Sequence, residues 1–240
     1  MKIKYHRHAF ALITVSLMLT ACSSDSDSSD TTVPLVTTTT VAVSSDTEGV
    51  TPITPNGLTA TLSTIPAGAS VSSADAAGLI LMREEEKLAH DVYVTLGNVW
   101  GSNVFSNISQ AENTHVSSVG TLLARYDIKD PTTSTEIGVF TDPTFTKLYS
   151  ELVATGSKSL VDAMTVGAVI EDLDIMDLQR LVSASPDIAI VYDALELGSR
   201  NHMRAFYRQL QRLGADYTPT YISQDAFEAI IAGNMEQGAM

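Results

Sequence analysis

The feature that most constrains the fold of this 240-residue chain is a helical repeat of apolar residues in four long stretches. Apolar residues there recur at spacings of three and four, which places them along one face of an α-helix. The predicted helices span about 73–97, 106–126 (or 109–126), 159–183 and 186–213. Ser73 and Asp75 are candidate caps of the first helix. No alternating pattern typical of strands competes with these helices, so the fold class is predicted to be all-α.

The connections between these helices indicate how they are arranged. Short links join the first helix to the second and the third to the fourth, which suits antiparallel hairpins. More than 30 residues separate the second helix from the third, and they include a loop at 127–142 and a shorter helix at about 143–154. Two hairpins joined by one long crossover are typical of a ferritin-like four-helix bundle, which we therefore predict. One further short helix is expected in the tail, 217–233.

The N-terminus has the pattern of an export signal. A basic start and a short apolar run precede Leu19-Thr20-Ala21-Cys22, which resembles a bacterial lipobox. We predict a lipoprotein signal peptide at 1–21 and lipidation of Cys22; the alternative is an ordinary secretory signal with an incidental cysteine. The expected location is the cell envelope. In a Gram-negative cell we expect the outer membrane, because serine rather than aspartate follows Cys22. The membrane is then contacted through the lipid alone.

Composition separates a linker from a folded domain. Residues 22–72 are rich in Ser, Thr and Asp and lack aromatic residues, so this segment is predicted to be a disordered linker. The folded domain is expected at 73–232. Without the signal, the chain has 11 basic and 28 acidic residues, a net charge of −17. This charge argues against nucleic acid and favours cation attraction. Since Cys22 is the only cysteine, thiolate catalysis and Cys-based metal sites within the domain are excluded.

Polar residues interrupt the apolar face of every predicted long helix. The candidate metal ligands are Glu85, Glu112, His115, Glu171, Asp174 and His202. Carboxylates buried together on facing helices would repel one another unless cations neutralise them. Carboxylate oxygens and imidazole nitrogens are ligands suited to iron and manganese. We therefore predict a buried metal site, with two iron ions or manganese as the cofactor.

The spacing of these ligands matches a known pattern in part. In carboxylate bundles, two helices give one Glu each and two give Glu-x-x-His. Glu112-x-x-His115 is complete, whereas the fourth helix has Ser199 where a second Glu is expected, before His202. The missing carboxylate is either absent or replaced by Asp174, so the site is predicted to be asymmetric.

Several neighbouring residues leave alternatives open. Glu86 is the alternative to Glu85 as the ligand from the first helix, because consecutive glutamates cannot all face inward. Glu84 and Lys87 are expected to face solvent. Tyr93 is interpreted as an aromatic core residue rather than a redox group.

Four segments of the chain are distinctive in combination: LMREEEKLAHDVY, FSNISQAENTHVSSV, GVFTDPTFTKLYSELVATGSKSLVDAMTVGAVIEDLDI and GSRNHMRAFYRQL. Together they resemble a bacterial and archaeal ferritin-like family catalogued as a domain of unknown function. The resemblance covers roughly residues 74–223. It implies a ferritin-like bundle and no established activity.

Two classes of function follow from these observations. The first is a di-iron or iron/manganese protein that oxidises or sequesters iron or removes peroxide, with metal ions and oxygen or peroxide as its partners. The alternative is a non-catalytic helical lipoprotein, a scaffold or adhesion module, with a vestigial or single-metal site. A homodimer is compatible with either function, and the sequence does not assign an enzyme activity.

Overall fold

The protein is described by a computed structural model that covers residue 62 and residues 71–236. The predicted signal peptide, Cys22 and nearly all of the predicted linker lie outside these residues. The helices of the described part are α2 (Ser73–Trp100), α3 (Asn103–Arg125), α4 (Pro143–Gly156), α5 (Leu160–Arg180), α6 (Pro186–Arg212) and α7 (Gln224–Ala232). No strand occurs among the described residues, which confirms the all-α prediction. None of these helices is both long and apolar enough to cross a membrane.

Local sequence signals explain where the helices begin and end. Ser72, one residue before the predicted caps, is the N-cap of α2, and its hydroxyl accepts a hydrogen bond from the Asp75 backbone N–H at 3.0 Å. At the other end, Gly101 adopts a left-handed φ of 61° and donates its N–H to the Gly97 carbonyl at 2.8 Å. This helix stop leaves only Gly101 and Ser102 between α2 and α3, so the two helices form a tight hairpin.

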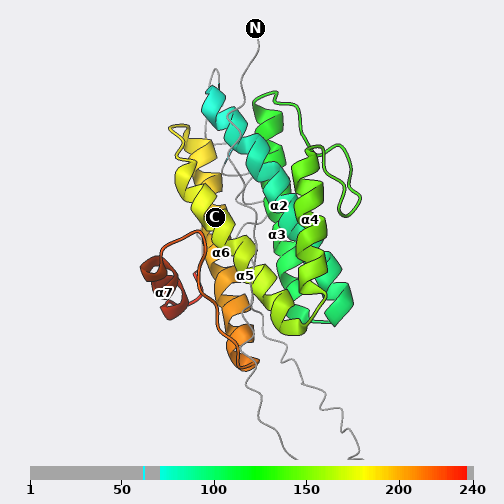
Figure 1. The fold of residues 1–240 in the computed structure, drawn as a ribbon. Coiled ribbons are helices and arrows are strands. Elements are labelled where there is room, and N and C mark those ends of the chain that lie inside the picture. The colour runs from blue at the N-terminus through cyan, green and yellow to red at the C-terminus, as the bar shows by residue number, and fades with distance from the viewer. Residues whose placement is uncertain (1–61, 63–70, 237–240) are drawn as a thin grey trace, which may run out of the picture. The chain divides into compact units, whose positions relative to one another are not determined.

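The long helices pack in pairs that also contact each other. α2 lies along α3, and α5 lies along α6; α2 also contacts α5, and α3 also contacts α6. α4 belongs to the long connection between α3 and α5 and packs against α2 and α5. Figure 1 shows α4 running beside the first hairpin, and α7 lying against α6. Each of the four long helices therefore has two long neighbours on which to bury an apolar face.

Two apolar clusters occupy different levels along these helices. One is built around the aromatic rings of Tyr93, Phe105 and Phe206, whose centroids lie 5.2–5.9 Å apart. The other contains Met82 of α2 and Leu122 of α3, with further residues of α5 and α6. Buried polar residues lie between the two levels on all four long helices. Apolar side chains therefore shield this polar layer from water at both ends, which strengthens the electrostatic interactions within it.

The long connection buries residues that were expected to face solvent. Glu84 is 5% exposed and accepts a hydrogen bond from the Asp142 backbone N–H at 3.1 Å. Lys87 is 6% exposed; it pairs with Asp91 and donates to the Glu136 carbonyl at 3.0 Å. The prediction of solvent exposure for Glu84 and Lys87 is wrong, because the crossover covers the side of α2 that points away from the other long helices.

A buried carboxylate fastens the C-terminal segment to α5. Asp172 accepts hydrogen bonds from the Tyr217 hydroxyl at 2.8 Å and from three consecutive backbone N–H groups, those of residues 220–222. Four donors satisfy this charge without any cation. Asp172 is therefore a structural residue, although it follows a predicted metal ligand directly in the sequence.

Candidate metal centre

Each of the four long helices contributes at least one polar side chain to the layer between the apolar clusters. Glu86 comes from α2, Glu112 and His115 from α3, Glu171 from α5 and His202 from α6. All five are at most 1% exposed. Ionisable groups that are so completely removed from water need partners of opposite charge or must change their protonation state.

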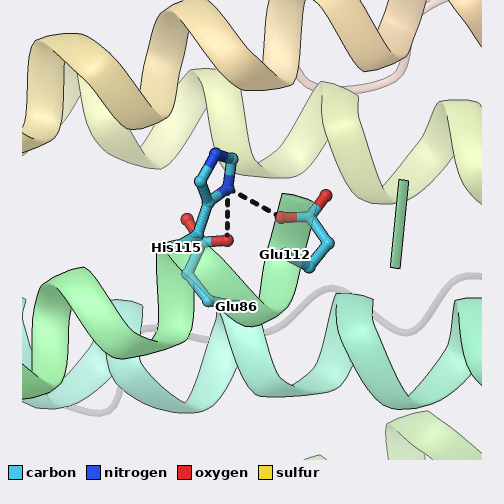
Figure 2. Close-up of side chains that lie close together, drawn as sticks. All are labelled: Glu86, Glu112 and His115. Atoms are coloured by element: carbon cyan, nitrogen blue, oxygen red, sulfur yellow. Dashed lines mark hydrogen bonds and ion pairs between the residues drawn. The ribbon is translucent and has the colours of Figure 1, made fainter. Parts of the chain in front are cut away.

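The first group of potential ligands consists of Glu86, Glu112 and His115. Nδ1 of His115 lies 2.7 Å from Oε2 of Glu112 and 3.1 Å from Oε2 of Glu86. Figure 2 shows the two carboxylates converging on the same ring nitrogen. The potential ligand atoms of the three residues all lie within 4.8 Å of one another, close enough to contact a single metal ion.

The second group consists of Glu112, Glu171 and His202. Nδ1 of His202 lies 2.8 Å from Oε1 of Glu112 and 3.5 Å from Oε2 of Glu171. These ligand atoms also lie within 4.8 Å of one another. The group therefore has the same composition as the first, two carboxylates and one imidazole.

Glu112 belongs to both groups and uses a different oxygen in each. Its Oε2 faces His115 and its Oε1 faces His202. The two imidazole rings stack with their centroids 5.6 Å apart and an interplanar angle of 28°. A carboxylate with one oxygen toward each of two ligand sets is suited to bridge two cations, because both oxygens can act as ligands at once.

Some carboxylate oxygens of the two groups have no hydrogen-bond donor. Oε1 of Glu86 is buried and accepts no hydrogen bond, and the nearest donor to the buried Oε2 of Glu171 is Nδ1 of His202, at 3.5 Å. Buried oxygen acceptors are nearly always satisfied, and each unsatisfied one costs about 1–3 kcal/mol. A cation bound by these groups would satisfy both oxygens, so the residues present fit a metal centre.

The histidines are strongly biased toward their charged form. Burial would lower the pKa of His202, but Glu112 and Glu171 outweigh it and raise this pKa to about 9. The pKa of His115 is likewise raised well above its ordinary value, because the charges of Glu86 and Glu112 overcome the effect of burial. Protons on the imidazoles therefore take the place of cationic charge when no metal ion is bound.

The glutamates differ in the direction of their pKa shifts. Burial acts to raise the pKa of Glu112, but the charges of His202 and His115 lower it below its ordinary value. At Glu86 the effect of burial, which raises the pKa, is larger than the effect of the charge of His115, which lowers it, and the pKa rises to about 8. Burial also raises the pKa of Glu171. Glu112 is thus the carboxylate of the layer whose ionised form is favoured most by its neighbours.

Tyr93 connects the polar layer to the aromatic cluster below it. Its hydroxyl donates a 2.5 Å hydrogen bond to Oε1 of Glu171, while its ring packs against Phe105 and Phe206. The core position predicted for Tyr93 is confirmed, since the residue is fully buried. Its contact with Glu171 was not predicted, because the separation of 78 residues gives no local signal.

The structure brings four of the six predicted ligands together, with Glu86 as the fifth member. Glu112, His115, Glu171 and His202 belong to the two groups, and α2 contributes Glu86, the alternative, rather than Glu85. Glu85 and Asp174 are buried, at 1% and 2% exposure, but belong to neither group. Their metal ligation, like that of the other residues, stays a prediction.

Ser199 does not replace the missing carboxylate. It is 2% exposed, and its hydroxyl donates to the Leu195 carbonyl one turn earlier in α6, at 3.1 Å. This is the usual way in which a serine inside a helix satisfies its hydroxyl. The residue therefore acts as a small packing residue, as predicted, and the asymmetry of the metal site stays a prediction.

Comparisons with known proteins find a family and a relative that are both described as uncharacterized. Residues 75–234 match a family model described as an uncharacterized protein domain, DUF2202. An uncharacterized protein of Methanocaldococcus jannaschii, MJ0754, is 51% identical over 170 residues, which cover 70% of this chain and 92% of that protein. The crystal structure of hypothetical protein MJ0754 matches with a TM-score of 0.70 at 50% identity, over 72% of this chain and 99% of that one.

Proposed function

This chain belongs to the DUF2202 family of uncharacterized domains, and we propose that it is a metal-binding protein with a carboxylate-bridged site for two ions. The observation that carries the proposal is the position of Glu112, whose two oxygens face two histidines from different helices. Two ions in adjacent groups would share this carboxylate. They would also relieve the repulsion among Glu86, Glu112 and Glu171, which are buried together.

The proposed architecture is a ferritin-like four-helix bundle formed by α2, α3, α5 and α6. The packing of two hairpins and the long connection between them support this assignment. In such bundles, inward-facing Glu and Glu-x-x-His ligands on the four helices hold a di-iron or di-manganese centre. The set here follows that pattern, with Ser199 in place of one glutamate.

Iron or manganese fits the donor set best. The set contains carboxylate oxygens and imidazole nitrogens, and it has no sulfur ligand. Bound Fe(II) would supply electrons for the reduction of oxygen or peroxide and would itself be oxidised. The proposed role is therefore to oxidise or sequester iron, or to remove peroxide. Within the protein, Glu112 fixes the position of both histidines, Tyr93 orients Glu171, and the apolar clusters exclude bulk water.

We also propose that the domain is held at the cell envelope by a lipid on Cys22. The lipobox-like sequence before Cys22 and the polar segment after it support this proposal. A tether of Ser, Thr and Asp residues would let the domain stand away from the membrane. Incorporation of a labelled fatty acid into the wild-type protein, and its loss in Cys22→Ser, is the direct test.

The test of the proposed site is the metal content of the purified protein. Wild-type protein loaded anaerobically with Fe(II), or with Mn(II), should retain stoichiometric metal after gel filtration, as measured by elemental analysis. The double variant Glu112→Ala, His115→Ala should retain little. Wild-type protein that is folded but takes up neither ion would contradict the proposal and favour the scaffold alternative. Absorbance changes after peroxide is mixed with the Fe(II)-loaded protein would then separate turnover from storage.

A single-ion site is a second candidate, and one observation favours it. Because Ser199 bonds to its own helix, one bridging carboxylate serves two groups where two are usual. A second ion would then have to share Glu112 with the first and would bind more weakly. Titration with Mn(II) distinguishes the candidates, because two ions of similar affinity favour the bridged pair and one tight ion favours the single site.

A further inference from the structure

A second set of buried acids lies beside the metal centre, between α2 and α5. Glu85 of α2 is 1% exposed, and among the described residues the only side chain that shares a hydrogen bond with its carboxyl is another acid, Asp177. Asp174 of α5 is 2% exposed, and its Oδ2 lacks a hydrogen bond. Both are buried acids like those of the two ligand groups, yet neither residue belongs to a group.

The acids on α5 form one series along that helix. Glu171, Asp174 and Asp177 follow each other at spacings of three, so each side chain neighbours the next while the series turns around α5 by about 120° from Glu171 to Asp177. Glu171 at one end is a member of the metal centre and is fully buried. Asp177 at the other end has a side chain that is 18% exposed, with Arg180 3.9 Å away. The series therefore runs from the buried centre to a position that water reaches.

Glu85 and Asp174 connect electrostatically to both ends of this series. Burial, and then the charges of Asp177 and Glu86, raise the pKa of Glu85 well above its ordinary value. For Asp174 the causes after burial are the charges of Glu86, Glu171 and Glu85. The charge of each acid therefore affects the pKa of its neighbour, from Asp177 through Glu85 and Asp174 to the ligands of the metal centre.

We propose that Asp177, Glu85 and Asp174 form a path by which a divalent cation reaches the buried metal centre. The inference rests on the proposed function, because it takes the two ligand groups as the destination. An ion enters at Asp177, contacts the buried carboxyl oxygens of Glu85 and Asp174 in turn, and arrives beside Glu86 and Glu171. Each carboxyl that the ion contacts releases the proton it carries and takes one up again when the ion moves on, so no proton is gained or lost over the whole transfer along the path.

The path solves a problem that the burial of the centre creates. A divalent cation cannot cross the apolar clusters at either end of the centre, because they offer no ligand to replace its hydration shell. Carboxylates placed at successive steps supply such ligands, and an acidic opening also raises the local concentration of cations. The three acids lie between α2 and α5, at the side of the centre, where this replacement can occur.

The effect of such a path is kinetic. Removing a group that only assists transit slows entry and exit by the same factor, so the dissociation constant stays unchanged. Removing a ligand instead weakens binding and lowers the number of ions bound. The two roles are therefore distinguished when rates and affinity are measured on the same variants.

The experiment uses Co(II) as the probe and the folded wild-type protein, Asp177→Asn and Glu85→Gln. Stopped-flow absorbance of the bound ion gives the loading rate, transfer to a chelator gives the release rate, and elemental analysis gives the number of ions bound. Asp193→Asn is the matched control, because it removes one exposed acid from the neighbouring α6. Thermal unfolding of each metal-free variant checks that it folds.

The path predicts that Asp177→Asn and Glu85→Gln load and release Co(II) about tenfold more slowly, within the range by which acidic openings accelerate cation capture. The stoichiometry of both variants, and the dissociation constant of Asp177→Asn, should match those of the wild type and of Asp193→Asn. Wild-type rates in both variants would overturn the path while leaving the metal centre intact. A lost ion in Glu85→Gln at an unchanged loading rate would also overturn it and make Glu85 a ligand. Wild-type protein that binds no Co(II), Fe(II) or Mn(II) would contradict the proposed function itself.

Discussion

Glu112 on α3 and His202 on α6 approach each other to 2.8 Å between Oε1 and Nδ1, at the centre of a layer that water does not reach. The other oxygen of the same carboxylate lies 2.7 Å from Nδ1 of His115. One negative charge therefore stabilises two imidazolium rings in the metal-free protein. Bound cations would take over the role of the imidazole protons, so proton binding and metal binding compete for the same groups.

Replacing Glu112 by glutamine should lower the pKa of His202. The charge of Glu112 is the largest influence that raises this pKa to about 9, and burial opposes it. Glutamine keeps the shape and removes the charge, so His202 should lose its proton at a lower pH. Histidine NMR titrations of the metal-free wild type and Glu112→Gln measure the change. An unchanged pKa of His202 would show that the contact between the two residues is absent in solution.

The stability of the metal-free protein should fall as the pH rises from about 6.5 to about 9. The pKa of His202 is about 9 in the fold against an ordinary value of 6.5, so its stabilising contribution is complete below pH 6.5 and lost toward pH 9. The pKa of Glu86 is raised from 4.5 to about 8, so the fold also holds this proton more tightly than the unfolded chain does. Urea unfolding midpoints across this pH range check the slope.

Metal binding should reverse that dependence. Carboxylate and imidazole ligands bind cations in their deprotonated forms, so the stabilisation by Mn(II) should increase with pH over the same range. The comparison is made between unfolding midpoints with Mn(II) and with a chelator. A stabilisation that is constant with pH would mean that the ion binds elsewhere, away from Glu86 and His202.

Tyr93→Phe should weaken the group that contains Glu171. The hydroxyl of Tyr93 holds Oε1 of Glu171 at 2.5 Å, and loss of such an orienting hydrogen bond typically costs about 10–100-fold in metal affinity. Tyr192→Phe is the control, because the buried Tyr192 hydroxyl has no hydrogen-bond partner. Mn(II) titrations of the two variants should differ, with affinity reduced only in Tyr93→Phe. Equal Mn(II) affinities in the two variants would show that Tyr93 contributes to the core and does not orient Glu171.

Asp172→Ala should destabilise the domain without affecting the metal centre directly. The substitution removes the acceptor of the Tyr217 hydroxyl and of three backbone N–H groups. Leaving buried donors unsatisfied costs about 1–3 kcal/mol each, so unfolding free energy should fall by about 3 kcal/mol or more. Chemical denaturation measures the loss. A change below about 1 kcal/mol would show that the C-terminal segment contributes little to stability.

Much of this arrangement could be predicted from the sequence, because apolar residues recur every three or four positions in an amphipathic helix. The interruption of apolar series by Glu112, His115, Glu171 and His202 identified residues that the structure places in one buried layer. The helix boundaries differ from the predicted ones by a few residues, for reasons as local as the caps at Ser72 and Gly101.

The environment of α2 could not be predicted in the same way. Periodicity identifies one buried face, whereas the residues from 84 to 87 are buried on several sides of this helix. Glu86 faces His115, but Glu84 contacts the crossover near Asp142. A loop without a period gives no indication of the helix that it covers. The choice between Glu85 and Glu86 depends on the rotation of α2, which is set by packing against α3 and α5.

Selective loss of metal from variants of the two groups tests most directly whether Glu112 serves two ions. Elemental analysis of Mn(II)-loaded protein should give about two ions per chain in the wild type, one for each group. Glu86→Gln should lose one ion and Glu112→Gln should lose both, while Glu84→Gln, which changes a buried acid outside both groups, should lose none. A Glu112→Gln protein that is folded and still binds as many ions as the wild type would contradict the account.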